Sequence, residues 1–225
     1  MALSHTYAAE LGSSASGTVL TTGTFDSTGF EHLVAFCKHE GAPTTLAVTD
    51  NKSSTIGGLT KVNHGGGGLS SQLFHGAVGS PGSGHTVTLT LGAARTWRDV
   101  AVWLIDADGA GVELDVEAAG GSGTGTAADA GSIVATAAAI HIFGVGQAGS
   151  PSTQTPSAGW TKHSQVADDL KASRAEVSAT TTDPSSTSVG SSNWAAVAAA
   201  FREVAGGGGF QAAWAANSNV LLMVD

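Results

Sequence analysis

The feature that most constrains the fold of this chain is its short-range hydrophobic pattern. Apolar and β-branched residues recur in short runs, and Gly, Ser, Pro, Asn and Asp separate these runs. Helical periodicity is nearly absent. Strands at roughly 8–12-residue spacing with such turn signals are typical of an all-β sandwich. The predicted strands are 18–22, 31–38, 44–49, 59–64, 69–78, 85–91, 99–106, 112–118, 131–136, 139–147, 160–166, 172–179 and 194–204.

The domain organisation follows from the spacing of these runs. No interior segment is rich enough in linker residues to mark a second domain, and 225 residues suit one large sandwich. We therefore predict an N-terminal arm over residues 1–17, a single antiparallel β-sandwich domain over 18–205, and a glycine hinge with an apolar C-terminal tail over 206–225.

The C-terminal tail is unusual for the end of a finished domain. After four glycines it carries large apolar side chains, among them Phe210, Trp214, Val220, Leu221, Leu222 and Met223. Such side chains gain free energy by burial, either on their own subunit or on a neighbour. The tail therefore predicts an assembly component that docks through these residues. The alternative is that Phe210 and Trp214 fold back on their own sandwich as an extra strand.

Composition and charge exclude several function classes. Charged residues make up 12% of the chain, about half of the usual share of roughly 25%. With 9 basic and 18 acidic residues the net charge is −9, and the basic stripe that binds nucleic acid or anionic membranes is absent. The single Cys37 allows no intramolecular disulfide, which fits folding in a reducing cytoplasm. There is no secretory signal and no long apolar run, so a soluble protein is expected.

No catalytic, cofactor or metal site is predicted. The strongest cation candidate is the segment from Asp106 through Asp108 to Gly109, but Ala110 stands where a calcium loop needs its third ligand. An Asp-Gly turn between two strands is the preferred interpretation. The 8 histidines lack zinc-site spacing, and His141 is expected to face outward. The Gly-x-Ser-x-Gly elbow of hydrolases is also absent.

Tryptophan side chains supply a second functional hypothesis. Trp103 and Trp194 lie in apolar runs and are expected in the core, whereas Trp97 and Trp160 lie beside turns. An exposed indole ring can stack on the face of a sugar. Trp97 and Trp160 are therefore the candidate exposed aromatics of a glycan-binding module.

Several segments, taken in order, resemble a β-sandwich module of many tailed-phage structural proteins and some bacterial surface proteins. The most specific is the closing run from Ser191 to Phe201, which reads SSNWAAVAAAF. The others are the turn 48–51 (VTDN), the strands 71–75 (SQLFH), 84–90 and 100–105, and the element 159–161 (GWT). Together they extend over about residues 18–204.

The resemblance implies a jelly-roll-like virion component with no conserved active site to carry over. It implies binding to a major capsid protein and to copies of itself, as a homotrimer, at the capsid surface after assembly in the host cytoplasm. We therefore expect a non-enzymatic bacteriophage structural protein, a capsid decoration (cement) protein that stabilises the head lattice through intersubunit contacts. The alternative is a receptor- or glycan-binding module of a tail fibre or surface protein.

Overall fold

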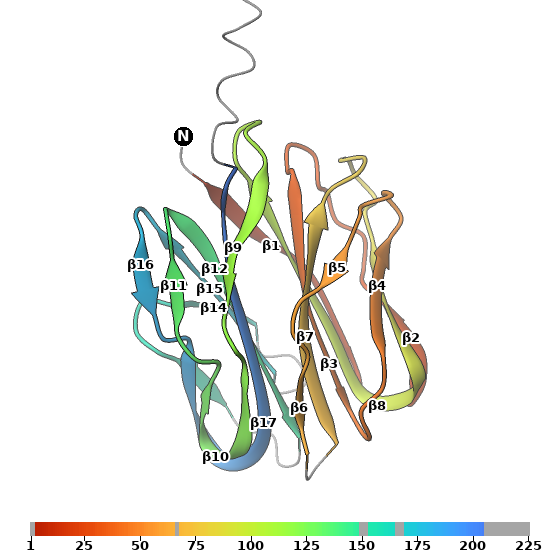
Figure 1. The fold of residues 1–225 in the computed structure, drawn as a ribbon. Helices are drawn as coiled ribbons and strands as arrows, with labels where there is room; N and C mark the ends of the chain where they lie inside the picture. The colour runs from red at the N-terminus through yellow and green to blue at the C-terminus, as the bar shows by residue number, and fades with distance from the viewer. Residues whose placement is uncertain (1–2, 66–67, 149–152, 165–168, 205–225) are drawn as a thin grey trace, which may run out of the picture.

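The computed structural model of the protein is built from antiparallel β-strands (Figure 1). It describes residues 3–65, 68–148, 153–164 and 169–204. Two sheets pack face to face across a shared apolar layer. The predicted all-β sandwich is confirmed, and its jelly-roll connectivity stays a prediction.

The strands divide between the two halves of the chain. The first half forms β1 (Ser4–Ser13), β2 (Gly17–Thr21), β3 (His32–Glu40), β4 (Leu46–Asp50), β5 (Gly57–Gly58), β6 (Val62–His64), β7 (Leu69–Ala77) and β8 (Val87–Asp106). The second half forms β9 (Val112–Glu117), β10 (Gly121–Asp129), β11 (Ile133–Ala135), β12 (Ala139–Ala148), β13 (Gln154–Pro156), β14 (Thr161–Ser164), β15 (Leu170–Glu176), β16 (Thr180–Thr182) and β17 (Ser185–Glu203).

Each half contributes one large sheet, and the two large sheets have the same strand order; β11 and β16 of the second half form a separate two-stranded sheet. The first sheet runs β1-β8-β3-β7-β5, and the second runs β10-β17-β12-β15-β14. In both, the longest strand is the last of its half, with 20 residues in β8 and 19 in β17. The start of β8 also pairs with β2 and β4, as the start of β17 pairs with the end of β10 and with β13. The sandwich is thus a tandem repeat of one topology. The domain organisation predicted from the sequence, with residues 1–17, 18–205 and 206–225, does not include this repeat.

The N-terminal segment belongs to the first sheet. Residues 4–13 were expected within an arm, and this expectation is wrong, because β1 pairs with β8 from Ser4 opposite Asp106 to Ser13 opposite Arg98. Tyr7 packs against the central apolar layer. The strand signal of this segment is weak because small and polar residues dominate it, and its partner lies far along the chain.

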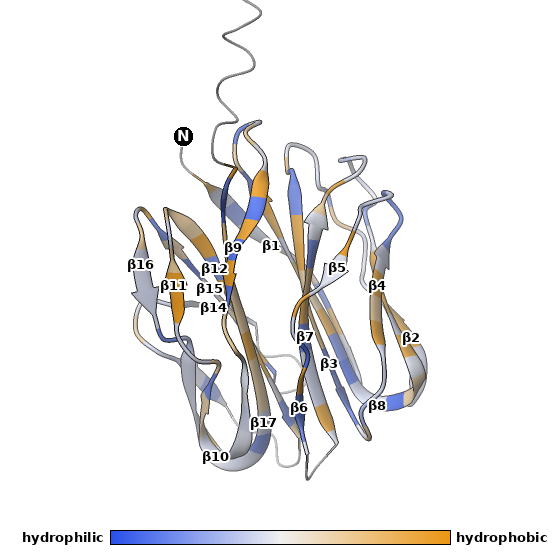
Figure 2. Cartoon of the chain, viewed as in Figure 1, coloured by the Kyte–Doolittle hydropathy of each residue, from blue (hydrophilic) through white to orange (hydrophobic). Residues whose placement is uncertain are grey.

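Strand alternation sends successive side chains into different cores. On β3, Phe36 enters the layer between the sheets, whereas Ala35 and Cys37 face an outer layer covered by β2, β4 and the start of β8. A corresponding outer layer on the second sheet includes residues of β10 and β11. On β9 apolar residues alternate with acidic ones instead, as the colours in Figure 2 show. The central layer contains Val34, Phe36, Leu73, Ala101, Trp103, Ile105, Ile140, Ile142, Val197, Ala199 and Phe201.

The strand β8 is longer than its sequence pattern predicts. The pattern gives two strands, 85–91 and 99–106, because Gly92 and other small residues lie between them. In the structure β8 continues through this segment, and Arg95 pairs with Gly17 near the start of β2. β8 thereby contributes side chains both to the central layer and to the outer layer of the first half.

Two glycines of β12 allow the sheets to approach closely. A Cβ added at Gly144 would lie 2.2 Å from the ring of Phe36, and one at Gly146 would lie 2.7 Å from Cγ of Lys38. Both distances are shorter than real contacts of a Cβ atom. Small residues at these positions are therefore a condition for the face-to-face packing.

The substitution Gly144→Ala tests this condition. We expect the free energy of unfolding to fall by about 1–3 kcal/mol, because the fully buried Phe36 ring must shift. Urea denaturation measures the change. Gly57→Ala on β5 is the matched control, since a Cβ there meets nothing within 4 Å, and it should change the stability by less than about 1 kcal/mol. Equal effects of the two substitutions would contradict the role assigned to Gly144.

Candidate functional site

The most concentrated chemistry in the described residues is a group of charged side chains buried between the sheets. We call it the ionic cluster. It contains Glu10, Lys38, Glu40, Asp99, Asp169 and Lys171. Alternation of the strands places Lys38 on β3, Asp99 on β8 and Lys171 on β15 on the faces that point toward the opposite sheet.

The first lysine of the cluster belongs to the first half of the chain. Lys38 Nζ lies 3.0 Å from Glu40 Oε1 on its own strand and 3.4 Å from Asp169 Oδ2 on the second half. The other oxygen of Asp169 accepts a hydrogen bond of 2.8 Å from the backbone N–H of Gln147. The side chains of Lys38 and Asp169 are both fully buried.

The second lysine makes the reverse connection. Lys171 belongs to the second half, and its Nζ lies 2.6 Å from Glu10 Oε1 and in direct contact with Asp99 Oδ2, both of the first half. Each half therefore supplies a buried ammonium group to a carboxylate of the other. In a low-dielectric interior such reciprocal pairing offsets part of the desolvation cost of the charges.

Burial also sets the protonation of the cluster. It raises the pKa of Asp99 to about 8, against the opposing effect of Lys171, and it raises the pKa of Asp169 against Lys38. Burial acts to lower the pKa of Lys171, but Asp99, Asp169 and Glu10 outweigh it and the pKa is raised. At neutral pH we therefore expect a charged Lys171. Four carboxyl groups face two ammonium groups, so a proton shared among the buried carboxyl groups removes part of the excess negative charge.

A carboxyl group with a raised pKa is a common general acid in enzymes. Here the side chains of Asp99, Asp169, Lys38 and Lys171 have 0% exposure. A substrate from solvent has no access to them in this conformation. The arrangement therefore joins the two sheets and does not form an open catalytic site.

A serine and two histidines lie beside the cluster. The Oγ of Ser173 on β15 is 2.6 Å from Nε2 of His5 on β1 and 2.5 Å from Nε2 of His163 on β14. One imidazole accepts the hydroxyl proton and the other donates an N–H. The ring of Tyr7 stacks on His163 with centroids 5.1 Å apart. Burial lowers the pKa of both histidines, so both are neutral at pH 7.

A serine next to a histidine is also the core of nucleophilic catalysis. Ser173, however, is fully buried and its oxygen lies between two imidazoles. Because His5 comes from the first half and Ser173 from the second, the hydrogen bond extends the connection that the ionic cluster makes.

Trp97 is 45% exposed, in agreement with the prediction from its position. A register shift between β3 and β8 places Trp97 and Arg98 together opposite His39, which makes a β-bulge. Trp97 has a φ of 47°, in the left-handed region that bulky residues rarely adopt. Arg98 turns inward and donates hydrogen bonds to the carbonyl oxygens of Val19 and Ala15. The bulge thus presents the indole on a rigid strand.

Trp160 and His141 are buried, and the prediction that both are exposed is wrong. Trp160 is 9% exposed, and its ring centroid lies 5.5 Å from that of Phe143 in the outer core of the second half. His141 is fully buried, and a hydrogen bond of 2.9 Å joins its Nδ1 to Thr182 Oγ1. The reason is the outer layer, because residues from β11 and β16 cover this face of β12.

The candidate calcium loop is a turn held by hydrogen bonds. Asp106 Oδ1 accepts the backbone N–H of Asp108 at 2.8 Å, and Glu31 accepts the backbone N–H groups of Gly109 and Gly111. The downstream acidic side chains bond elsewhere, Glu113 to Arg202, Asp115 to Thr136 and Glu117 to Thr60. Across the described ranges, no group of three or more His, Cys, Asp or Glu side chains could hold a metal ion.

A histidine pair lies at another point of the central layer. His32 Nε2 and His75 Nδ1 are 3.1 Å apart, and both rings contact Phe201. Burial and the neighbouring His75 lower the pKa of His32 to about 4. The pair is therefore neutral at physiological pH and acts as a packed hydrogen-bonded unit.

The predicted docking residues of the tail, Phe210, Trp214, Val220, Leu221, Leu222 and Met223, lie outside the described residues. Sequence reasoning missed the ionic cluster. A signal was present, because Lys38 and Lys171 stand inside or beside apolar strand runs of a chain that has few charges. The pairing of these lysines with carboxylates of the other half has no local signal.

Comparison with protein-family models, curated proteins and solved structures found no match to this chain. Among the described residues there is no helix long and apolar enough to cross a membrane.

The substitution Lys171→Met tests the ionic cluster. It leaves Asp99 and Glu10 without their ammonium partner, and we expect the free energy of unfolding to fall by about 3–5 kcal/mol. Lys52→Met is the control, since its Nζ bonds only the exposed loop carbonyl of Ser83, at 2.9 Å, and it should cost about 1 kcal/mol or less. Urea denaturation of both variants measures the difference. A Lys171 variant as stable as the wild type would show that the halves do not depend on this pairing.

Proposed function

We propose that this protein is a non-enzymatic structural protein of a tailed-phage virion, most specifically a capsid decoration protein. In this function it binds the major capsid protein and copies of itself, as a homotrimer, at the head surface. The resemblance of the run from Ser191 to Phe201 and of the preceding segments supports the phage assignment. That run lies in β17, the long strand of the second sheet that pairs with β9, β10, β12 and β13.

The observation that carries the non-enzymatic part is the burial of the reactive side chains. The groups best suited to acid–base or nucleophilic chemistry, Asp99, Lys171 and Ser173, are closed between the sheets and bond across the two halves. Their interactions join the halves into one body. A body of this kind suits a protein that must keep its shape on a particle surface.

The proposed mechanism is burial of apolar and backbone surface between subunits. The tail after Gly209 supplies large apolar side chains beyond the last strand. A subunit held at several points on a lattice has a high effective concentration at each contact, so individually weak contacts add up to stable decoration.

Heads isolated from a phage that lacks the gene test this proposal. Purified full-length protein should cosediment with the heads and saturate. The double variant Leu221→Ser and Leu222→Ser should bind at least about 10-fold more weakly, because each buried leucine contributes about 1.5–3 kcal/mol. The double variant Ser218→Ala and Asn219→Ala is the matched control in the same segment. Normal binding of the leucine variant would refute tail docking, and binding of the wild type to tails alone would refute decoration.

Trp97 favours a second candidate function, a receptor- or glycan-binding module. An exposed indole held by a β-bulge in an unfavourable backbone conformation, which costs about 1–3 kcal/mol, is a recurrent property of binding sites. Its face is available for stacking on a sugar ring. The possible partner in this case is a surface glycan.

A glycan array tests the second candidate. Binding by the wild type should be lost in Trp97→Ala and retained in Val19→Ala, because Val19 is similarly exposed, at 53% against 45% for Trp97, but is not aromatic. Both variants should fold, since neither side chain is part of a core. Absence of binding by the wild type, or equal binding by both variants, would exclude a role of Trp97 in glycan recognition.

A further inference from the structure

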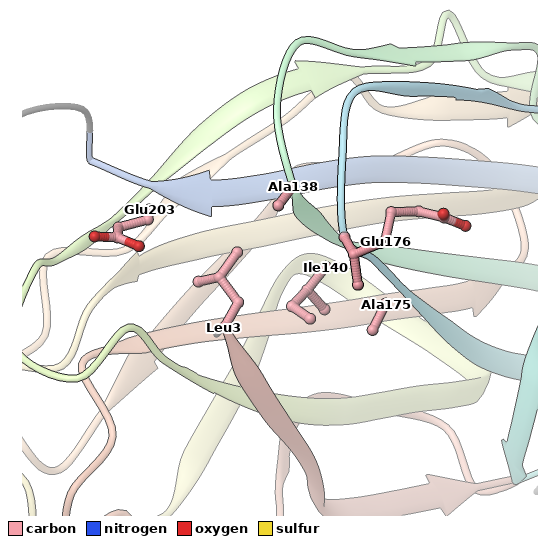
Figure 3. A pocket seen from close by; sticks show the side chains of 7 residues that line it. Leu3, Ala138, Ile140, Ala175, Glu176 and Glu203 are labelled. Carbon is pink, nitrogen blue, oxygen red and sulfur yellow. The ribbon is translucent and has the colours of Figure 1, made fainter. Parts of the chain in front are cut away.

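An apolar pocket of about 210 Å³ opens where the second sheet ends. Leu3, Ala138, Ile140, Ala175, Glu176, Val177 and Glu203 line it. Figure 3 shows Leu3 and Ile140 facing the same space, with the carboxylates of Glu176 and Glu203 on opposite sides. The lining of the pocket is thus mainly apolar, and the two carboxylates point away from Leu3 and Ile140.

Strand pairing explains why a hollow forms at this place. Ala139 begins β12 and pairs with Glu176, the last residue of β15, and with Arg202 near the end of β17. One strand therefore begins and its two neighbours end at the same place. Leu3 of the first half closes the other side.

The apolar side chains at this pocket are incompletely covered. Val177 is 94% exposed, the highest value among the large apolar side chains that the structure describes as exposed. Ile140 at the floor belongs to the central layer. Apolar surface beside a core residue gains free energy when an apolar partner covers it.

The C-terminal tail begins at this pocket. Glu203 lines the pocket, and the next residue, Val204, is fixed by a hydrogen bond of 3.0 Å from its N–H to the carbonyl of Gly111. Ala205 and four glycines follow, and Phe210 is the first large side chain after them. Seven residues beyond Glu203, Phe210 can reach any point within roughly 24 Å of it, which includes the whole pocket.

We propose that the pocket is the docking site for the phenyl ring of Phe210 of the same chain. A cavity of about 150 Å³ lined by aliphatic and aromatic side chains is enough to bind benzene, so the volume of this pocket is sufficient for a phenyl ring. Residues 205–224 carry no charge, and they therefore pass Glu176 and Glu203 without an unpaired cation or a repelled carboxylate. Glycines between Val204 and Phe210 permit the sharp return that the docking requires.

Docking within one chain is favoured over docking between copies because of effective concentration. A short tether holds its ligand at millimolar concentration near the site, far above the concentration of a second copy in solution. The docked ring removes Phe210 from water before the tail meets any partner. The inference concerns the free subunit and does not depend on the proposed role in a virion.

Methyl NMR of the full-length protein tests the inference. A docked ring displaces the resonances of Leu3, Ile140 and Val177 through its ring current. Phe210→Ala should shift these resonances to the positions found after deletion of 206–225, and it should leave the exposed Val134 and Val189 unchanged. Trp214→Ala, the matched variant of the next aromatic residue, should not reproduce the shift. Unchanged pocket resonances in Phe210→Ala would overturn the proposal.

A substitution at the pocket provides an independent test of the proposal. Val177→Asp is tolerated by the fold because the side chain is exposed, but it places a carboxylate at the mouth. In this background Phe210→Ala should produce little further change at Leu3 and Ile140. The same shifts in Trp214→Ala alone would instead assign Trp214 to the pocket, and shifts that grow with protein concentration would assign the tail of a second copy. Either result overturns docking of Phe210 within its own chain.

Discussion

The packing of the two sheets against each other is the interaction on which the rest of the structure depends. One part of the interface is apolar, around Phe36 and Trp103, and another part is ionic, around Lys38 and Lys171. The two parts constrain each other. A one-residue slip of β3 would move Lys38 to the outer apolar layer and Cys37 to the ionic one. The ionic cluster therefore specifies one register and one relative placement of the halves, while apolar burial supplies most of the favourable free energy.

The strands were predictable from the sequence, but the interactions that join the two sheets were not. Alternation and turn residues are local signals, and they were sufficient for the all-β sandwich and for most strands between residues 31 and 147. The pairing of Lys171 with Asp99 and Glu10 is not local, because the partners come from opposite halves and meet only when the sheets pack. The same limit explains Trp160. Its position beside a turn is visible in the sequence, whereas the outer layer that covers it is not.

The repeated topology explains why few large side chains are enough to form the buried layers of the sandwich. Each half buries both faces of its sheet, one against the other half and one against its own outer strands. Small residues then become useful, since Gly144 and Gly146 let the second sheet approach Phe36 and Lys38, and the alanines of β17 fill narrow layers. The repeat is not evident as sequence similarity, because the topology requires only small or apolar side chains at alternate positions.

Covering both faces of both sheets restricts where recognition can occur. The positions left for recognition are those where strand pairing is interrupted or ends. The bulge of β8 is an interruption and presents Trp97. The common end of β12, β15 and β17 is the other kind of position, and it forms the apolar pocket from which the tail departs. The reactive side chains are held inside to join the halves, so the proposed contacts with other molecules are placed at these two positions and on the tail.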